Sequence, residues 1–287
     1  MIATLDHTAL SNAAMIVDVP VRLGRFATTA RWSGDGTLGA VLVLHSLGLD
    51  RRAFDALRRE LPGGFKVMSF DQRGHGSAAA ETAETLADCV EDAVAALALC
   101  DGPVHLVGHS MGGAVAACAA AQLPLRAATL TLIASPPLGV PGFAQRGEPA
   151  LAGGMQAVVA TTLARWFGDI PSKMDAAAID YARGALFAMH PEGFAAAWRA
   201  LGSFEGYVGL ADKLPATLCI AGADDLSTPP VLMRHIVDAY ARSGAEHAPR
   251  FEVVERAGHM VPLTAPDAIA ALLKSHWDIQ PRSLRHL

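Results

Sequence analysis

The chain has 287 residues, of which 52% are hydrophobic and 18% are charged. This composition excludes an intrinsically disordered protein and is enough for one large core with an insertion. The 23 Lys and Arg residues against 28 Asp and Glu give a net charge of −5 with no basic run, which disfavours nucleic acid as a partner.

Eight β-rich segments are predicted as strands. They are Met15–Leu23, Ala27–Trp32, Ala40–Leu44, Lys66–Phe70, Val104–Val107, Thr129–Ile133, Leu218–Ala221 and Phe251–Val254. The first two alternate as at an antiparallel edge, whereas the later short apolar runs are typical of a parallel sheet buried on both faces. Helical patterns lie between them, at Thr82–Cys100, Ser110–Gln122 and Ala265–Trp277. Strands alternating with helices predict an open α/β sheet whose ligands bind beyond the carboxyl ends of the strands.

The alternation breaks after Ile133, where several Pro and Gly residues begin a stretch without a strand pattern before Leu218. We therefore predict a helical cap, residues 137–209, inserted into a core made of residues 1–136 and 210–287. The cap holds nine of the 17 aromatic residues of the chain. These aromatics either line an apolar pocket over the site or supply the large side chains that small helices need for packing.

Several classes of partner and compartment are disfavoured. Apolar stretches such as Ala40–Leu44 and Ala114–Ala121 are far shorter than the roughly 18 residues of a membrane span. Residues Met1–His7 lack the regions of a secretory signal, so we expect a cytoplasmic protein. With neither ligand clusters nor a phosphate-binding glycine loop after the first strands, we expect no metal and no organic cofactor. The four cysteines lack metal-ligand spacing and are predicted to be buried free thiols; they are Cys89, Cys100, Cys118 and Cys219.

The segment Gly108-His109-Ser110-Met111-Gly112 matches G-x-S-x-G directly between a predicted strand and a predicted helix. That context is typical of a nucleophile elbow, in which glycines leave space around a serine on a tight turn. The alternative interpretation of Ser110 is an ordinary helix N-cap. The position of the motif favours the nucleophile.

A serine hydroxyl needs a base to take its proton, and the base needs a carboxylate to orient it. Among 11 histidines, His259 follows the last predicted strand in a glycine-led loop, so we predict it as the base. His109 adjoins Ser110 and should point away from the hydroxyl, and His75 belongs to another loop. Both are interpreted as structural.

The loop after Ala221 contains two candidate carboxylates. Asp225 is predicted to orient His259 because it lies further into the loop, and Asp224 is the alternative. The chain order Ser, Asp, His agrees with the order of triad residues that follows a nucleophile elbow.

The oxyanion needs two backbone N–H donors, one after the nucleophile and one in the loop after the third strand. These are predicted to be Met111 and Leu47. Leu47 is preferred to the alternative Ser46 because it lies two residues past His45.

The elbow, the loop Asp71-Gln72-Arg73-Gly74-His75-Gly76, Asp225 and His259 together make the chain resemble the α/β-hydrolase superfamily over essentially its whole length. Within it, the chain is similar to the β-ketoadipate enol-lactone hydrolase (3-oxoadipate enol-lactonase) group. The matching segments are Ser46-Leu47-Gly48-Leu49-Asp50, Ala164-Arg165-Trp166-Phe167 and Ala221-Gly222-Ala223-Asp224-Asp225 leading to Thr228-Pro229-Pro230. That group often has Asn where this chain has His45, and Leu where this chain has His109 and Met111.

The resemblance implies an α/β-hydrolase fold with an eight-stranded mostly parallel sheet and an inserted cap. It also implies that Trp166 lies against the substrate, and the candidate pocket comprises Trp166, His45, Ser46 and Arg165. Arg165, Arg183 or Arg199 would pair with a substrate carboxylate; the alternative for each is a solvated helix face.

The leading hypothesis is a serine hydrolase of a small lactone or carboxylic ester, with an acyl-enzyme on Ser110. The resemblance implies an enol-lactone of aromatic catabolism as substrate. The alternatives are a C–C bond hydrolase or acyltransferase with the same triad, and a non-catalytic ligand-binding protein. A monomer and a homo-oligomer are both compatible with the sequence.

Overall fold

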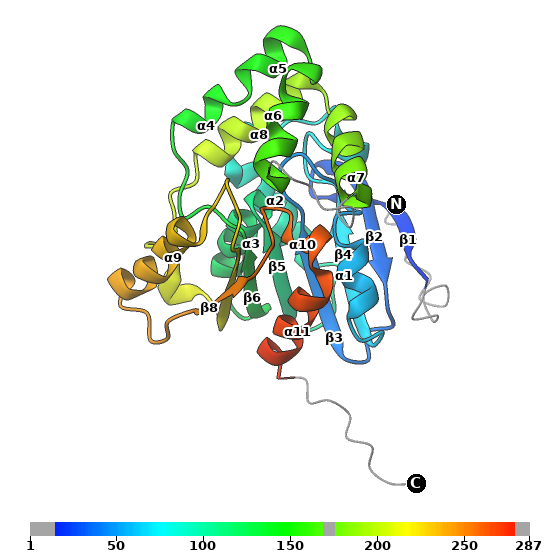
Figure 1. Cartoon of the computed structure of the whole chain (residues 1–287). Coiled ribbons are helices and arrows are strands. Elements are labelled where there is room, and N and C mark those ends of the chain that lie inside the picture. The colour runs from blue at the N-terminus through cyan, green and yellow to red at the C-terminus, as the bar shows by residue number, and fades with distance from the viewer. Residues whose placement is uncertain (1–14, 169–175, 279–287) are drawn as a thin grey trace.

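A computed structural model describes residues 15–168 and 176–278 of the chain, and a single eight-stranded sheet lies at its centre (Figure 1). The strand order is β1-β2-β4-β3-β5-β6-β7-β8. Its strands are β1 Val17–Leu23, β2 Phe26–Ser33, β3 Gly39–Leu44, β4 Phe65–Phe70, β5 Val104–His109, β6 Ala127–Ile133, β7 Thr217–Gly222 and β8 Arg250–Val254. β2 pairs antiparallel with both β1 and β4, and the strands from β4 to β8 are parallel. The predicted fold class is confirmed.

Helices cover both faces of this sheet (Figure 1). They are α1 Asp55–Glu60, α2 Leu86–Leu97, α3 Met111–Gln122, α9 Pro230–Ser243, α10 Val261–Thr264 and α11 Pro266–His276, with 3-10 turns at Gly76–Ala78 and Ala211–Lys213. α2 packs beside α3, and α1 packs beside α11. The prediction that α2 begins at Thr82 was wrong, because the Asp88 carboxylate accepts the Thr85 N–H at 2.9 Å and caps the helix there.

Five helices between β6 and β7 form the predicted helical cap above the carboxyl ends of the strands (Figure 1). They are α4 Gly142–Gln145, α5 Glu148–Gly153, α6 Gln156–Phe167, α7 Ala176–Phe187 and α8 Pro191–Gly202. The boundaries at 137 and 209 stay a prediction, and part of that range, 169–175, lies outside the described residues. Residues Met1–His7, on which the secretory prediction rests, lie outside them too. None of the described helices combines the length and apolar character of a membrane span.

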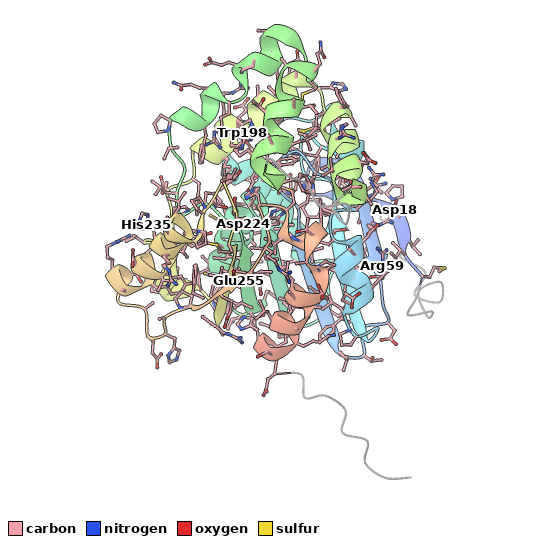
Figure 2. The ribbon with its side chains drawn as sticks, in the orientation of Figure 1. Asp18, Arg59, Trp198, Asp224, His235 and Glu255 are labelled. Atoms are coloured by element: carbon pink, nitrogen blue, oxygen red, sulfur yellow. The ribbon has the colours of Figure 1, made fainter. Side chains whose placement is uncertain are left out.

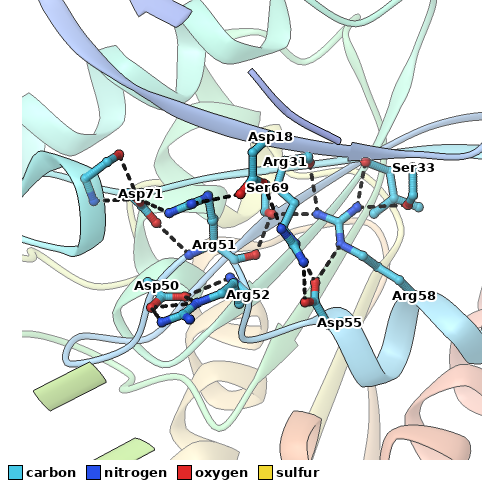
Figure 3. Close-up of polar contacts among 12 residues, drawn as sticks. Asp18, Arg31, Ser33, Asp50, Arg51, Arg52, Asp55, Arg58, Ser69 and Asp71 are labelled. Atoms are coloured by element: carbon cyan, nitrogen blue, oxygen red, sulfur yellow. Dashed lines mark hydrogen bonds and ion pairs between the residues drawn. The ribbon is translucent and has the colours of Figure 1, made fainter. Parts of the chain in front are cut away.

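An ion-pair network fastens α1 and its preceding loop to the antiparallel edge (Figure 3). Arg31 pairs with Asp18 and Asp55, each at 2.8 Å. The buried Arg58 guanidinium donates to the Val67 carbonyl at 2.7 Å and to the Ser33 hydroxyl at 3.0 Å. The network also ties the loop after β3 to this edge, because Arg51 in that loop pairs with Asp18 at 2.8 Å.

All four cysteines are free thiols. Three are buried, but Cys118 on α3 is partly exposed, so the prediction of a buried thiol was wrong at this position. Burial raises the pKa of the Cys89 and Cys219 thiols to about 12. These two thiols are therefore held in their unreactive protonated form.

Candidate active site

Ser110 lies on a sharp turn between β5 and α3, with φ 54° and ψ −117°. A positive φ is strained for a residue with a Cβ, and such strain concentrates at functional sites. A Cβ on Gly108 would overlap the Gly112 carbonyl, and one on Gly112 would overlap the Leu44 carbonyl. The two glycines of the motif are thus the residues that let the chain make this turn.

His259 brings an imidazole to the serine from the loop after β8. The Ser110 hydroxyl lies 3.1 Å from His259 Nε2, and His259 Nδ1 lies 2.8 Å from an Asp225 carboxylate oxygen. Since the carboxylate only accepts, Nδ1 carries the proton and Nε2 is left free to accept one from serine. The His259 backbone N–H donates to the Trp166 carbonyl in the cap at 2.9 Å. The structure thus joins the predicted base to the cap.

Asp225 is held by four hydrogen-bond partners. Its Oδ1 accepts the backbone N–H groups of Ser227 at 2.7 Å and Thr228 at 2.9 Å. Its Oδ2 lies 2.8 Å from both the Thr228 hydroxyl and His259 Nδ1. Burial alone would raise the pKa of this carboxyl, but the His259 charge and the hydrogen bonds from His259 and Thr228 outweigh it and lower the pKa to about 2. The carboxylate is therefore ionised at neutral pH.

The structure brings Asp225, and not Asp224, to the histidine. The Asp224 side chain is exposed, at the carboxyl end of β7 and beneath the cap that carries Trp198 (Figure 2). The backbone N–H of Asp224 donates to the Ala257 carbonyl at 2.9 Å, which keeps the two loops together.

The predicted oxyanion donors, Leu47 and Met111, lie on two different elements of the core, the loop after β3 and the first residue of α3. Met111 is the first residue of α3, so its N–H has no acceptor within the helix. Leu47 lies in the loop after β3 and lines the same cavity as Ser110. Leu47 and Met111 therefore remain the predicted oxyanion donors, one from each element.

Two buried histidines support the Leu47 loop. His45 Nε2 accepts the Gln72 N–H, and His75 Nε2 accepts the Gly48 N–H, each at 3.0 Å. The Nδ1 atom of each ring donates to a nearby backbone carbonyl at 2.8 Å. Burial lowers the pKa of both imidazoles, to about 3 for His75, so they stay neutral and can accept. His45 thus lies behind the loop, whereas Ser46 lines the cavity.

His109 also contacts the base loop. Its Nε2 donates to the His259 carbonyl at 2.8 Å, and burial lowers its pKa to about 3. Its Nδ1 is buried and has no hydrogen-bond partner among the residues that the structure describes. This geometry agrees with the prediction that His109 has a structural role.

Side chains of the cap line a small cavity over Ser110. Its cap residues include Phe143, Arg146, Trp166, Trp198 and Leu201. The open space is about 30 Å³, which is room for roughly one or two water molecules. This space is smaller than an ester or lactone substrate.

Two guanidinium groups flank the Trp198 ring, at 4.9 Å for Arg146 and 5.7 Å for Arg165. Burial lowers the pKa of both, to about 10 for Arg165. Within residues 15–168 and 176–278, neither has a carboxylate at ion-pair distance, while Arg183 pairs with Asp180 on the surface. Arg199 is exposed as well. Arg146 was not predicted from the sequence. The one feature that could have indicated it is its position in the aromatic-rich cap.

No group of three or more His, Cys, Asp or Glu side chains in the described segments is arranged to hold a metal ion. The polar groups of the site instead form one hydrogen-bonded line from carboxylate to hydroxyl.

Comparison with known proteins identifies the family and the fold of the chain. The sequence profile of the family described as "Alpha/beta hydrolase family" matches residues 41–272. The (E)-2-((N-methylformamido)methylene)succinate hydrolase of Acinetobacter baylyi is 26% identical over 88% of this chain and 95% of its own length. The 3-oxoadipate enol-lactonase 1 of the same organism is 28% identical over 82% of this chain and 87% of its own. The crystal structure of an enol-lactonase from Burkholderia xenovorans has the same fold, with a TM-score of 0.81 at 22% identity over 91% of this chain and all of that one.

Proposed function

The chain belongs to the alpha/beta hydrolase family, and from that premise we propose that it is a serine hydrolase that cleaves a small lactone or carboxylic ester through an acyl-enzyme on Ser110. The observation that carries the proposal is the continuous line from Asp225 through His259 to Ser110, with links of 2.8 and 3.1 Å. This is the arrangement that activates a serine hydroxyl.

In the first half of the reaction, Ser110 Oγ attacks the carbonyl carbon while its proton moves to His259 Nε2. The carbonyl oxygen becomes an oxyanion between the N–H groups of Leu47 and Met111. The C–O bond then breaks, and the leaving oxygen takes the proton from His259. In a lactone this oxygen stays tethered to the acyl group.

In the second half, water attacks the acyl-enzyme and gives its proton to His259. Collapse of the second oxyanion releases the acid and returns the proton to Ser110. Asp225 stays ionised throughout and stabilises the imidazolium that forms in each half.

The substrate is further proposed to carry a carboxylate. A half-buried guanidinium without a counter-ion is costly, and a substrate carboxylate beside Arg146 would compensate its charge. The relatives named for a succinate and for 3-oxoadipate enol-lactone support the same substrate class. An enol-lactone is therefore the first substrate to assay.

The test compares hydrolysis of 3-oxoadipate enol-lactone with that of p-nitrophenyl acetate. Ser110→Ala should reduce kcat for both by at least about 10³-fold, because the nucleophile is lost. A folded Ser110→Ala protein with wild-type turnover would refute the acyl-enzyme.

A second pair of variants tests the carboxylate separately. Arg146→Met should raise KM for the enol-lactone about tenfold or more and leave KM for the neutral ester unchanged. Arg183→Met is the matched control, because Arg183 is already paired on the surface. Equal effects of Arg146→Met on both substrates would remove the carboxylate from the proposal.

A further inference from the structure

A second chain of hydrogen bonds, separate from the one through His259, ends at the backbone carbonyl of Ser110. The Ser135 hydroxyl, just past β6, lies 3.1 Å from the Ser110 carbonyl oxygen. The Tyr207 hydroxyl, on the segment between α8 and β7, lies 3.0 Å from the Ser135 hydroxyl. Ser135 and Tyr207 are 0% and 1% exposed, so water does not compete for these contacts.

The chemistry of the three groups fixes the direction of this line. A carbonyl has no proton, so Ser135 donates to Ser110. The single proton of Ser135 is then used, and Tyr207 has to donate to Ser135. Burial raises the pKa of the Tyr207 phenol well above its ordinary value, so the phenol keeps the proton that it donates.

The acceptor of this line is half of the peptide group that holds a proposed oxyanion donor. The Ser110 carbonyl and the Met111 N–H belong to one planar unit, so a group that fixes the carbonyl also fixes the direction of the N–H. Donation to the oxygen also polarises the peptide and strengthens its N–H as a donor, since hydrogen bonds in a chain reinforce one another.

We propose that Ser135 and Tyr207 are positioning residues that hold and polarise the Ser110–Met111 peptide, and thereby aim the Met111 N–H at the oxyanion. This inference rests on the proposed function, because it needs an oxyanion next to Ser110.

The Ser110–Met111 peptide is in contact with donors from α3 and from Ser135. The peptide follows a residue with a strained φ of 54°. Two amides of α3 also reach the Ser110 carbonyl, Gly113 at 2.9 Å and Ala114 at 3.4 Å. Ser135 adds a donor from outside the helix, and it lies so close that a Cβ on Gly113 would be 2.5 Å from its hydroxyl.

The test uses Ser135→Ala and Tyr207→Phe, with Tyr240→Phe as a matched control. Tyr240 is also a buried tyrosine, and it donates to the Thr217 hydroxyl at 2.8 Å, between α9 and β7. Ser135→Ala should lower kcat about tenfold and Tyr207→Phe about threefold, with KM unchanged. The inhibition constant of an aryl trifluoromethyl ketone, which forms an oxyanion on the serine, should rise by the same factors.

If Ser135 and Tyr207 only stabilise the fold, different results are expected. The three substitutions would then lower the melting temperature and leave kcat and the inhibition constant unchanged. That result, or an equal loss of kcat in Tyr240→Phe, would overturn the inference. Because Tyr207 acts through Ser135, the double variant should be no slower than Ser135→Ala alone.

Failure of this inference is distinguishable from failure of the proposed function. If Ser110→Ala is inactive while both positioning variants keep wild-type kcat, only the inference fails. If Ser110→Ala keeps turnover, the proposed function fails first. Should Ser135→Ala not fold, Tyr207→Phe and its control decide the question.

Discussion

Replacing Asp225 by asparagine exchanges one oxygen of a buried carboxylate for an NH₂ group and, in the geometry of this loop, forces the proton of His259 onto the wrong nitrogen. Oδ1 of Asp225 accepts two backbone N–H groups, from Ser227 and Thr228. An NH₂ group cannot face those donors, so it has to occupy the position of Oδ2.

In that position the NH₂ group of asparagine finds an acceptor. The Thr228 hydroxyl is 2.8 Å from the Ala134 carbonyl and can donate there, which frees its lone pair for the NH₂. The same NH₂ then points at His259 Nδ1, which has to accept. The imidazole proton moves to Nε2, where it blocks the transfer from Ser110.

The magnitude follows from the cost of turning the amide around. Turning it leaves two buried N–H donors unsatisfied, at about 1–3 kcal/mol each. The total cost of about 2–6 kcal/mol populates the productive arrangement at roughly 3 × 10⁻² to 4 × 10⁻⁵. With the loss of the negative charge that stabilises the imidazolium, we expect kcat to fall about 10⁴-fold, as for the corresponding exchange in serine proteases.

The assay is steady-state and stopped-flow hydrolysis of p-nitrophenyl acetate, with thermal unfolding to verify the fold. Asp224→Asn is the matched control, because the neighbouring carboxylate is exposed, and it should stay within about twofold of wild type. A loss of less than tenfold in folded Asp225→Asn, or an equal loss in the control, would refute the reasoning.

Three further predictions concern stability. Gly48→Ala places a Cβ at a φ of +88° and 2.6 Å from the Trp166 ring, so urea unfolding should show a loss of about 2 kcal/mol or more and KM should rise; wild-type stability would contradict this. Arg58→Met orphans the Val67 carbonyl and should cost about 2–4 kcal/mol in the same assay, whereas the exposed Arg59→Met should cost under about 0.5. Burial would raise the pKa of Asp50, but Arg52 lowers it to about 2, below the ordinary 3.8. The ionised Asp50 carboxylate therefore stabilises the folded protein above pH 4, and this contribution to the free energy of unfolding is lost as pH falls from 4 toward 2. Melting temperatures between pH 2 and 5 should show this loss, and Asp50→Asn should remove it.

The strands were predictable because their signals are local. A short apolar run between turn residues is visible without knowing its neighbours, and all eight runs became strands of one sheet. The start of α2 was missed because the cap at Thr85 is set by the Asp88 carboxylate, while the apolar pattern gives no sharp limit. Two of the cap helices, α4 and α5, are short, and α7 has only a weak apolar face, so the sequence predicts the insertion but not its parts.

The candidate site divides in the same way. Ser110, Asp225 and His259 each follow a strand, so topology alone brings them to one edge of the sheet. Arg146 and Tyr207 were missed because their partners are distant in sequence: Tyr207 meets a residue 72 positions earlier. Ser135 has one signal, its place at the carboxyl end of β6, and a hydroxyl there is uninformative until the elbow beside it is seen.

The hydrogen bond from the His259 backbone to the Trp166 carbonyl has a consequence for protein engineering. A Cβ on Gly258 would lie 2.7 Å from that same carbonyl, so the end of α6 and the loop of the base fit together with no room to spare. A chimera that takes its cap from another hydrolase changes its substrate specificity and also changes the backbone contact that holds the loop of His259. Grafts that keep the carbonyl of residue 166 in place should retain turnover, and grafts that shift it should fold yet hydrolyse nothing until the loop at 258 is redesigned with them.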